Sequence, residues 1–112
     1  DMDLAIPAEM GGSGDGANPE QLFAAGYAAC FHSALQSVAR QAKKKLGDSS
    51  VGARVSIGKA GEGFGLAVTL EVVIPDLPQD EAQQLADAAH QVCPYSNATR
   101  GNIRVDVQVV DD

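Results

Sequence analysis

A helix that is apolar on nearly every side is the feature that most constrains how this chain can fold. Residues 18–21, Asn-Pro-Glu-Gln, combine an N-cap residue, a proline at the first helical position and a glutamine that can complete a capping box. The pattern predicts a helix from there to about Leu46, ended by Gly47. Between Leu22 and Leu35 the helix is apolar nearly all round, which is typical of a helix buried on all sides. Because one chain of 112 residues has little material to surround it, we expect a homodimer.

The rest of the chain alternates between strand and helix patterns. Alternating apolar residues predict strands at residues 2–6, 51–60, 64–74 and 103–109. Gly61-Glu62-Gly63 predicts a hairpin turn between the middle two, and helical spacing from Pro78 predicts a second helix that ends at Cys93. The order β, long α, β-hairpin, α, β predicts a single α+β domain with both helices packed on an antiparallel sheet.

Charge and composition exclude several classes of protein. The formal net charge of −7 argues against binding to nucleic acid or to an anionic membrane surface, since both are negatively charged. We expect a cytoplasmic location, because no apolar run reaches ~20 residues and the sequence opens without a charged and then apolar signal segment. Two cysteines are too few for a secreted disulfide framework. The glycine-rich stretch at residues 11–16 lacks the Gly-Lys-Ser/Thr ending of a phosphate-binding loop.

Cys30 and Cys93 are the candidate reactive residues. Cys30 lies in the small-residue run 24–31, and Cys93 comes directly before Pro94, each on the apolar side of a predicted helix. They are either a redox pair, in which one thiol attacks and the other resolves, or two inert thiols that act as small hydrophobic groups in the core. Because the thiolate is the reactive form, local charge and exposure decide between these alternatives.

The two histidines suggest two further kinds of site. His32 is two positions from Cys30 and therefore points to a different side of the helix, which argues against a cysteine–histidine hydrolase. His90 and Cys93 are three positions apart and share a helix face, and with Cys30 and His32 they make a conceivable zinc set. Cys-x-His is not a usual spacing of zinc ligands, so we expect no metal.

Residues 18–31, which contain Cys30, and residues 93–102, which begin Cys-Pro-Tyr-Ser-Asn, resemble two motifs of the organic hydroperoxide resistance family, within the OsmC-like superfamily. The resemblance covers nearly the whole chain and implies an OsmC-like fold that forms an intertwined homodimer. It also implies an antioxidant thiol peroxidase for organic hydroperoxides, with Cys30 peroxidatic and Cys93 resolving. The implied cycle passes through a Cys30 sulfenic acid and a Cys30–Cys93 disulfide. A dithiol, carried as a lipoyl group on a carrier protein, would reduce that disulfide, and no bound cofactor is implied.

The resemblance also implies an acidic residue and an arginine at the site. Glu20 matches the family's acidic active-site residue, but ten helical residues separate it from Cys30 by about 15 Å along the axis. The two can meet only if the helix breaks near Gly26 or if Glu20 reaches the Cys30 of a second subunit. The family's arginine comes from an amino-terminal segment before residues 2–6, and no arginine of this sequence matches that motif. We therefore expect residues 1–112 to be a single OsmC-like domain that lacks this segment.

Four large apolar residues of the long helix have two alternative roles. Phe23, Tyr27, Phe31 and Leu35 either line an apolar substrate pocket, which would favour fatty hydroperoxides over hydrogen peroxide, or pack in an ordinary core. The function also has an alternative, a non-enzymatic OsmC-like dimeric binding module or redox sensor whose cysteines report oxidation. Turnover of an organic hydroperoxide in the presence of a dithiol would separate that alternative from a peroxidase.

Overall fold

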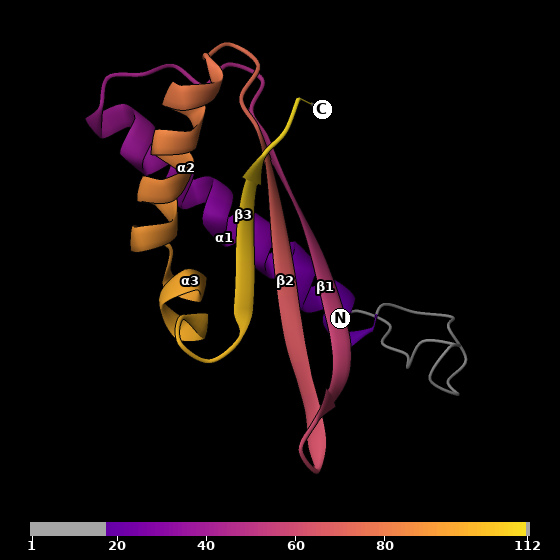
Figure 1. Cartoon of the computed structure of the whole chain (residues 1–112). Helices are drawn as coiled ribbons and strands as arrows, with labels where there is room; N and C mark the ends of the chain where they lie inside the picture. The colour runs from indigo at the N-terminus through magenta and orange to yellow at the C-terminus, as the bar shows by residue number, and fades with distance from the viewer. Residues whose placement is uncertain (1–17, 112) are drawn as a thin grey trace, which may run out of the picture.

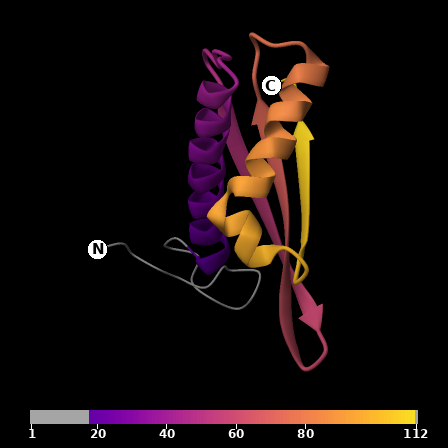
Figure 2. The same cartoon turned by 90° about the vertical axis from the view of Figure 1, so that its left-hand side faces the viewer.

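The computed structural model describes residues 18–111, in which helices pack against one face of a small sheet (Figures 1 and 2). In chain order the elements are α1 (Pro19–Gln41), β1 (Ser50–Ala60), β2 (Gly63–Val73), α2 (Gln79–Val92), α3 (Pro94–Thr99) and β3 (Arg104–Val109). The predicted α+β architecture is confirmed, while the strand expected at residues 2–6 and the loop at 11–16 lie outside the described residues. Within the described range no helix is long and apolar enough to cross a membrane.

The start of α1 follows directly from local chemistry. The Asn18 side chain accepts a hydrogen bond from the Gln21 N–H at 2.8 Å, and the Gln21 side chain accepts one from the Asn18 N–H at 3.1 Å. Together with Pro19 at the first helical position, this capping box satisfies backbone donors that an isolated helix end would leave unpaired. The predicted helix start is therefore confirmed.

The end of α1 differs from the prediction, because the helix stops before Gly47 is reached. Lys43 has a φ of 59°, the left-handed conformation usually taken by glycine at this position. The Lys43 N–H donates to the Arg40 carbonyl at 3.1 Å and the Lys44 N–H to the Ala39 carbonyl at 2.8 Å. These two bonds form a Schellman motif, which satisfies the last carbonyls although no glycine marks the position.

The sheet has the strand order β1-β2-β3 and is mixed. β1 and β2 are antiparallel and joined by a tight turn at Gly61 and Glu62, as the hairpin pattern predicts. β3 runs parallel to β2, so the prediction of an antiparallel sheet is wrong for this strand. The reason is the crossover, since α2 and α3 carry the chain back along the sheet before β3 begins, as parallel strands require.

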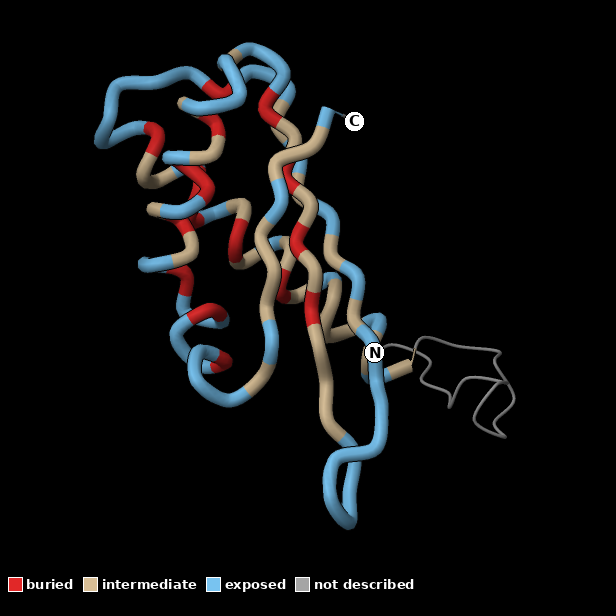
Figure 3. The backbone as a smooth tube through the Cα atoms, viewed as in Figure 1, coloured by how far each residue is buried: buried red, intermediate tan, exposed pale blue. Residues whose placement is uncertain are grey.

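One face of the sheet forms the core with the helices (Figure 3). Register places Ala53 beside Leu70 and Leu70 beside Val107, so apolar residues from all three strands share that face. The opposite face has a polar row across the strands, with Arg54 beside Thr69 and Thr69 beside Asp106. Beneath the apolar face α1 contributes three large side chains with no exposed surface, Tyr27, Phe31 and Leu35.

The apolar face continues past the helices to the far end of the β1–β2 hairpin. There Ile57 is 38% exposed and Phe64 is 65% exposed. The tube of this end of the hairpin is coloured as exposed (Figure 3). On α1 the side chains of Ala25 and Ala29 are also exposed. The described chain therefore covers one part of its apolar surface and leaves another part open to solvent.

Candidate active site

The two thiols come together at the middle of α1 and the junction between α2 and α3. Cys30 Sγ and Cys93 Sγ are 3.4 Å apart although the residues are 63 positions apart in the sequence, and both thiols are free. Cys93 ends α2 and begins α3, with extended backbone angles of φ −64° and ψ 124°. Pro94 favours this change of direction, because proline suits the first turn of a helix but disfavours helical angles in the residue before it.

The two sulfurs differ in their access to solvent. Cys93 has no exposed surface, whereas Cys30 is partly exposed. Burial raises the pKa of the Cys30 thiol, a hydrogen bond from the Tyr95 backbone opposes that rise, and the nearby Cys93 thiol adds to it. No cationic side chain among the described residues contributes to this shift of the Cys30 pKa. Cys30 is therefore mainly protonated at neutral pH, although it is the thiol that a small molecule can reach.

A buried chain of hydrogen bonds lies beside the thiols. Ser96 has no exposed surface, and its hydroxyl is 2.8 Å from the Tyr27 hydroxyl and 2.7 Å from His90 Nδ1. The Tyr27 hydroxyl also lies 3.3 Å from Thr99 Oγ1. Burial, assisted by the charge of Arg100, lowers the pKa of His90, so the imidazole is neutral at pH 7. No local sequence pattern predicts these hydrogen bonds, because the residues that make them lie on three different helices.

Aromatic rings form a wall next to Cys30. The rings of Phe23 and Tyr95 are stacked with centroids 6.2 Å apart, and the Tyr27 ring meets each of them edge-on at 5.8 Å. A Cβ atom at Gly26 would lie 3.4 Å from the Tyr95 ring, an ordinary van der Waals distance, so the ring packs directly over this position of α1. Tyr95 is 40% exposed. It lies in α3, with its ring over α1 one turn before Cys30.

Comparisons with known proteins identify the family. The family model of OsmC-like proteins matches residues 12–108. The organic hydroperoxide resistance protein of Xanthomonas axonopodis pv. citri is 57% identical over 107 residues, covering 94% of this chain and 75% of that protein. The chain belongs to the OsmC-like family, among the organic hydroperoxide resistance proteins.

Solved structures of this family have the same fold. The organic hydroperoxide resistance protein of Elizabethkingia anophelis is 52% identical, with a TM-score of 0.93 over 99% of this chain and 81% of that one. OhrB of Bacillus subtilis is 46% identical, with a TM-score of 0.87 over 98% of this chain and 82% of that one. The resemblance inferred from the two cysteine motifs is therefore confirmed.

The residue that matches the family's acidic residue does not lie near Cys30 of the same chain. Glu20 is in the first turn of α1, and α1 continues without a break through Gly26 and Cys30. The expected alternative of a helix break near Gly26 is therefore wrong. Of the two ways in which Glu20 was expected to meet a Cys30 thiol, contact with a second subunit is the one that an unbroken helix allows.

The four residues expected to line a pocket occupy different environments. Phe23 is partly exposed in the aromatic wall, whereas Tyr27, Phe31 and Leu35 lie in the core. Phe31 packs against His90, with ring centroids 6.5 Å apart. A role for these residues in binding substrate stays a prediction.

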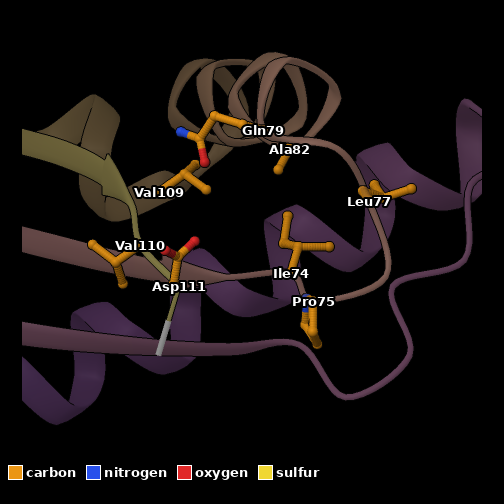
Figure 4. Close-up of a pocket in the computed structure, with 8 residues that line it drawn as sticks. All are labelled: Ile74, Pro75, Leu77, Gln79, Ala82, Val109, Val110 and Asp111. Atoms are coloured by element: carbon orange, nitrogen blue, oxygen red, sulfur yellow. The ribbon is translucent and has the colours of Figure 1, made fainter.

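Two further features lie away from the thiols. His32 Nε2 is 3.0 Å from Ser49 Oγ, and within residues 18–111 no group of three or more His, Cys, Asp or Glu could hold a metal ion. A cavity of about 250 Å³ lies where β2 and β3 end and α2 begins (Figure 4). It is lined by Ile74, Pro75, Leu77, Gln79, Ala82, Val109, Val110 and Asp111. Because Cys93 is at the other end of α2, this cavity is not part of the thiol site.

Proposed function

We propose that the chain is a thiol peroxidase that reduces organic hydroperoxides to alcohols. The observation that carries the proposal is the pair of free sulfurs 3.4 Å apart, one partly exposed and the other fully buried. Cys30 has the access that an attacking thiol needs. Cys93 is protected from solvent and close enough to attack the sulfenic acid that Cys30 would form. Membership of the organic hydroperoxide resistance proteins supports the substrate class.

The proposed chemistry has two steps on the protein and one with an external partner. The Cys30 thiolate attacks the distal peroxide oxygen, the O–O bond breaks, and the alkoxide takes up a proton and leaves as an alcohol. The Cys30 sulfenic acid then condenses with the Cys93 thiol, which forms a disulfide and releases water. An external dithiol, proposed to be a lipoyl group on a carrier protein, supplies the two electrons that restore both thiols.

We further propose that the working protein is a homodimer in which Glu20 serves the Cys30 of the partner chain. The unbroken α1 keeps Glu20 away from Cys30 in its own chain. The exposed apolar residues Ala25, Ile57 and Phe64 offer surface for a second copy to cover. In this arrangement the acidic residue orients a cationic group at the thiol, since a carboxylate alone would raise the pKa of the thiol further.

Two serine substitutions test the proposal. Cys30→Ser should abolish consumption of an organic hydroperoxide in the presence of excess dihydrolipoamide. Cys93→Ser should allow one fast oxidation of Cys30 and then over-oxidation to sulfinic acid, because no resolving thiol remains. Ser33→Ala, at an exposed position on α1, is the matched control. Near-normal turnover by Cys30→Ser would overturn the proposal.

The raised pKa of Cys30 favours one alternative, a redox sensor without turnover. A slowly reacting thiol that forms a stable disulfide reports oxidation instead of removing the oxidant. Dihydrolipoamide separates the two functions. An enzyme consumes many equivalents of hydroperoxide per chain, whereas a sensor consumes one equivalent and then remains oxidised.

A further inference from the structure

We infer that Tyr27, Ser96 and His90 are positioning residues that hold Cys93 beside Cys30 for formation of the disulfide. The inference rests on the proposed function, in which Cys93 must reach the Cys30 sulfenic acid before a second hydroperoxide molecule does. The three side chains act through the position of Cys93 and not through contact with the substrate.

The hydrogen-bonded chain joins the three helices that surround the two sulfurs. Ser96 on α3 lies between Tyr27 on α1, at 2.8 Å, and His90 on α2, at 2.7 Å. Tyr27 and Cys30 are three positions apart and therefore share one side of α1. One buried hydroxyl thus fixes the position of α3 relative to the helix that carries the attacking thiol.

Counting the protons shows that every member of the chain can be satisfied. Ser96 has one hydroxyl proton, so it donates to one neighbour and accepts from the other. If Tyr27 donates to Ser96, then Ser96 donates to His90 Nδ1. If His90 donates instead, Ser96 donates to Tyr27, whose own proton can go to Thr99 Oγ1 at 3.3 Å. In the described residues no buried side-chain polar atom lacks a partner.

The bond between His90 and Ser96 closes a loop around the resolving thiol. His90 lies three positions before Cys93 and Ser96 three positions after it. Arg100 adds a second tie, because its guanidinium donates to the His90 carbonyl and, at 2.6 Å, to Asn97 Oδ1. α3 is only six residues long and cannot hold its place by helix propensity alone. The side-chain ties therefore add to the backbone bonds of Cys93, whose N–H donates to the Ala89 carbonyl at 2.8 Å and whose carbonyl accepts from the Asn97 N–H at 3.0 Å.

The expected consequence is a faster closure of the disulfide. The distance between Cys30 Sγ and Cys93 Sγ must shorten from 3.4 Å to about 2.05 Å. A held loop needs only this small movement, whereas a released loop also samples positions in which Cys93 is farther away. Leaving one buried polar group without a partner typically shifts the equilibrium between the held and the released loop by about tenfold. We therefore expect formation of the disulfide to slow by that factor.

Substitutions at both ends of the Ser96–His90 bond test the inference. Mass spectrometry measures the fraction of Cys30 that becomes sulfinic acid, and the quantity compared is the hydroperoxide concentration at which this fraction reaches one half. Ser96→Ala and His90→Leu should lower it by about tenfold. His90→Asn should stay within about twofold of the unmodified protein, because an amide can replace Nδ1 as the partner of Ser96. Ser49→Ala removes the other serine–histidine bond, to His32, and should have no effect.

A second readout separates this inference from the proposed function. The equilibrium between the Cys30–Cys93 disulfide and glutathione needs no hydroperoxide, and Ser96→Ala and His90→Leu should shift it about tenfold toward the dithiol. If hydroperoxides do not oxidise Cys30, the proposed function fails, but this equilibrium still tests the ties. The inference is overturned if Ser96→Ala and His90→Leu show the glutathione equilibrium of the unmodified protein, or if His90→Asn is as impaired as His90→Leu.

Discussion

The two ends of the β1–β2 hairpin have the same apolar alternation but different surroundings. Leu70 and Val72 lie beneath the helices with no exposed surface, whereas Phe64, on the same face of β2, is 65% exposed. Ile57 on β1 is also exposed at this end. Alternation of apolar residues therefore specifies which face of a strand is apolar but not what covers that face. The open end of the hairpin is the part that a second copy of the chain is proposed to cover.

The largest effect is expected at the covered end. Leu70→Ala should lower the free energy of unfolding by about 3 kcal/mol, because it removes a fully buried side chain from between α1 and its neighbouring strands. Urea unfolding at fixed protein concentration measures the change. The same substitution at Leu66, a partly exposed position nearer the open end, is the comparison and should cost less than half as much. Equal losses at the two positions would contradict the distinction between the ends.

A substitution at the open end should affect association more than folding. Phe64→Ala should raise the dissociation constant of the proposed dimer by about a thousandfold, since burying a phenylalanine contributes about 2 kcal/mol and each of the two chains loses one. Sedimentation over a range of protein concentrations measures this constant. Lys59→Ala changes the cross-strand neighbour of Phe64 and serves as the control. A dimer that is indifferent to the loss of Phe64 would show that this end is not the interface.

The thiols belong to the covered region, and burial there predicts a definite pH dependence. The pKa of Cys30 is raised, so the thiol is protonated at neutral pH and becomes a thiolate as the pH rises. Below its pKa the rate of Cys30 oxidation by an organic hydroperoxide should therefore increase by about tenfold per pH unit. Stopped-flow measurement between pH ~6 and ~8 tests this sign. A flat profile would mean that a cation outside the described residues keeps Cys30 ionised.

The smallest effect is expected from mixing two inactive variants across the proposed interface. Glu20→Gln and Cys30→Ser chains should each have little peroxidase activity. In a one-to-one mixture that exchanges freely, about half of the dimers pair the two variants, and each has one intact site if Glu20 serves the partner. The mixture should then recover about a quarter of the normal activity. No recovery in a mixture shown to contain such dimers would contradict the shared site.

Local chemistry was predictable from the sequence, and long-range geometry was not. The capping box at Asn18 fixes the start of α1 because its partners are three residues apart. The end of α1 was missed because Lys43, not glycine, adopts the left-handed conformation. The direction of β3 was missed for a different reason. It depends on the path of the crossover through α2 and α3, which no local pattern of apolar residues specifies.

The candidate site shows the same division. Cys30 and Cys93 were paired through resemblance to a family, since 63 positions separate them and spacing alone left inert thiols as an alternative. The contacts of Ser96 were not predicted, because Tyr27 is 69 positions away and serine, tyrosine and histidine are ordinary residues at helix surfaces. What could have drawn attention to Ser96 is its place three positions after Cys93, symmetrical with His90 three positions before it.

The aromatic wall has an optical consequence. The chain contains no tryptophan and two tyrosines, Tyr27 and Tyr95, and both lie in the wall beside Cys30, with their ring centroids 5.8 Å apart. All tyrosine emission therefore comes from one place. Disulfides quench nearby excited tyrosines more strongly than thiols do, so ultraviolet fluorescence of the unlabelled protein should dim when the two sulfurs bond and recover when a dithiol separates them. The protein thus contains its own optical reporter of whether Cys30 and Cys93 are free or bonded.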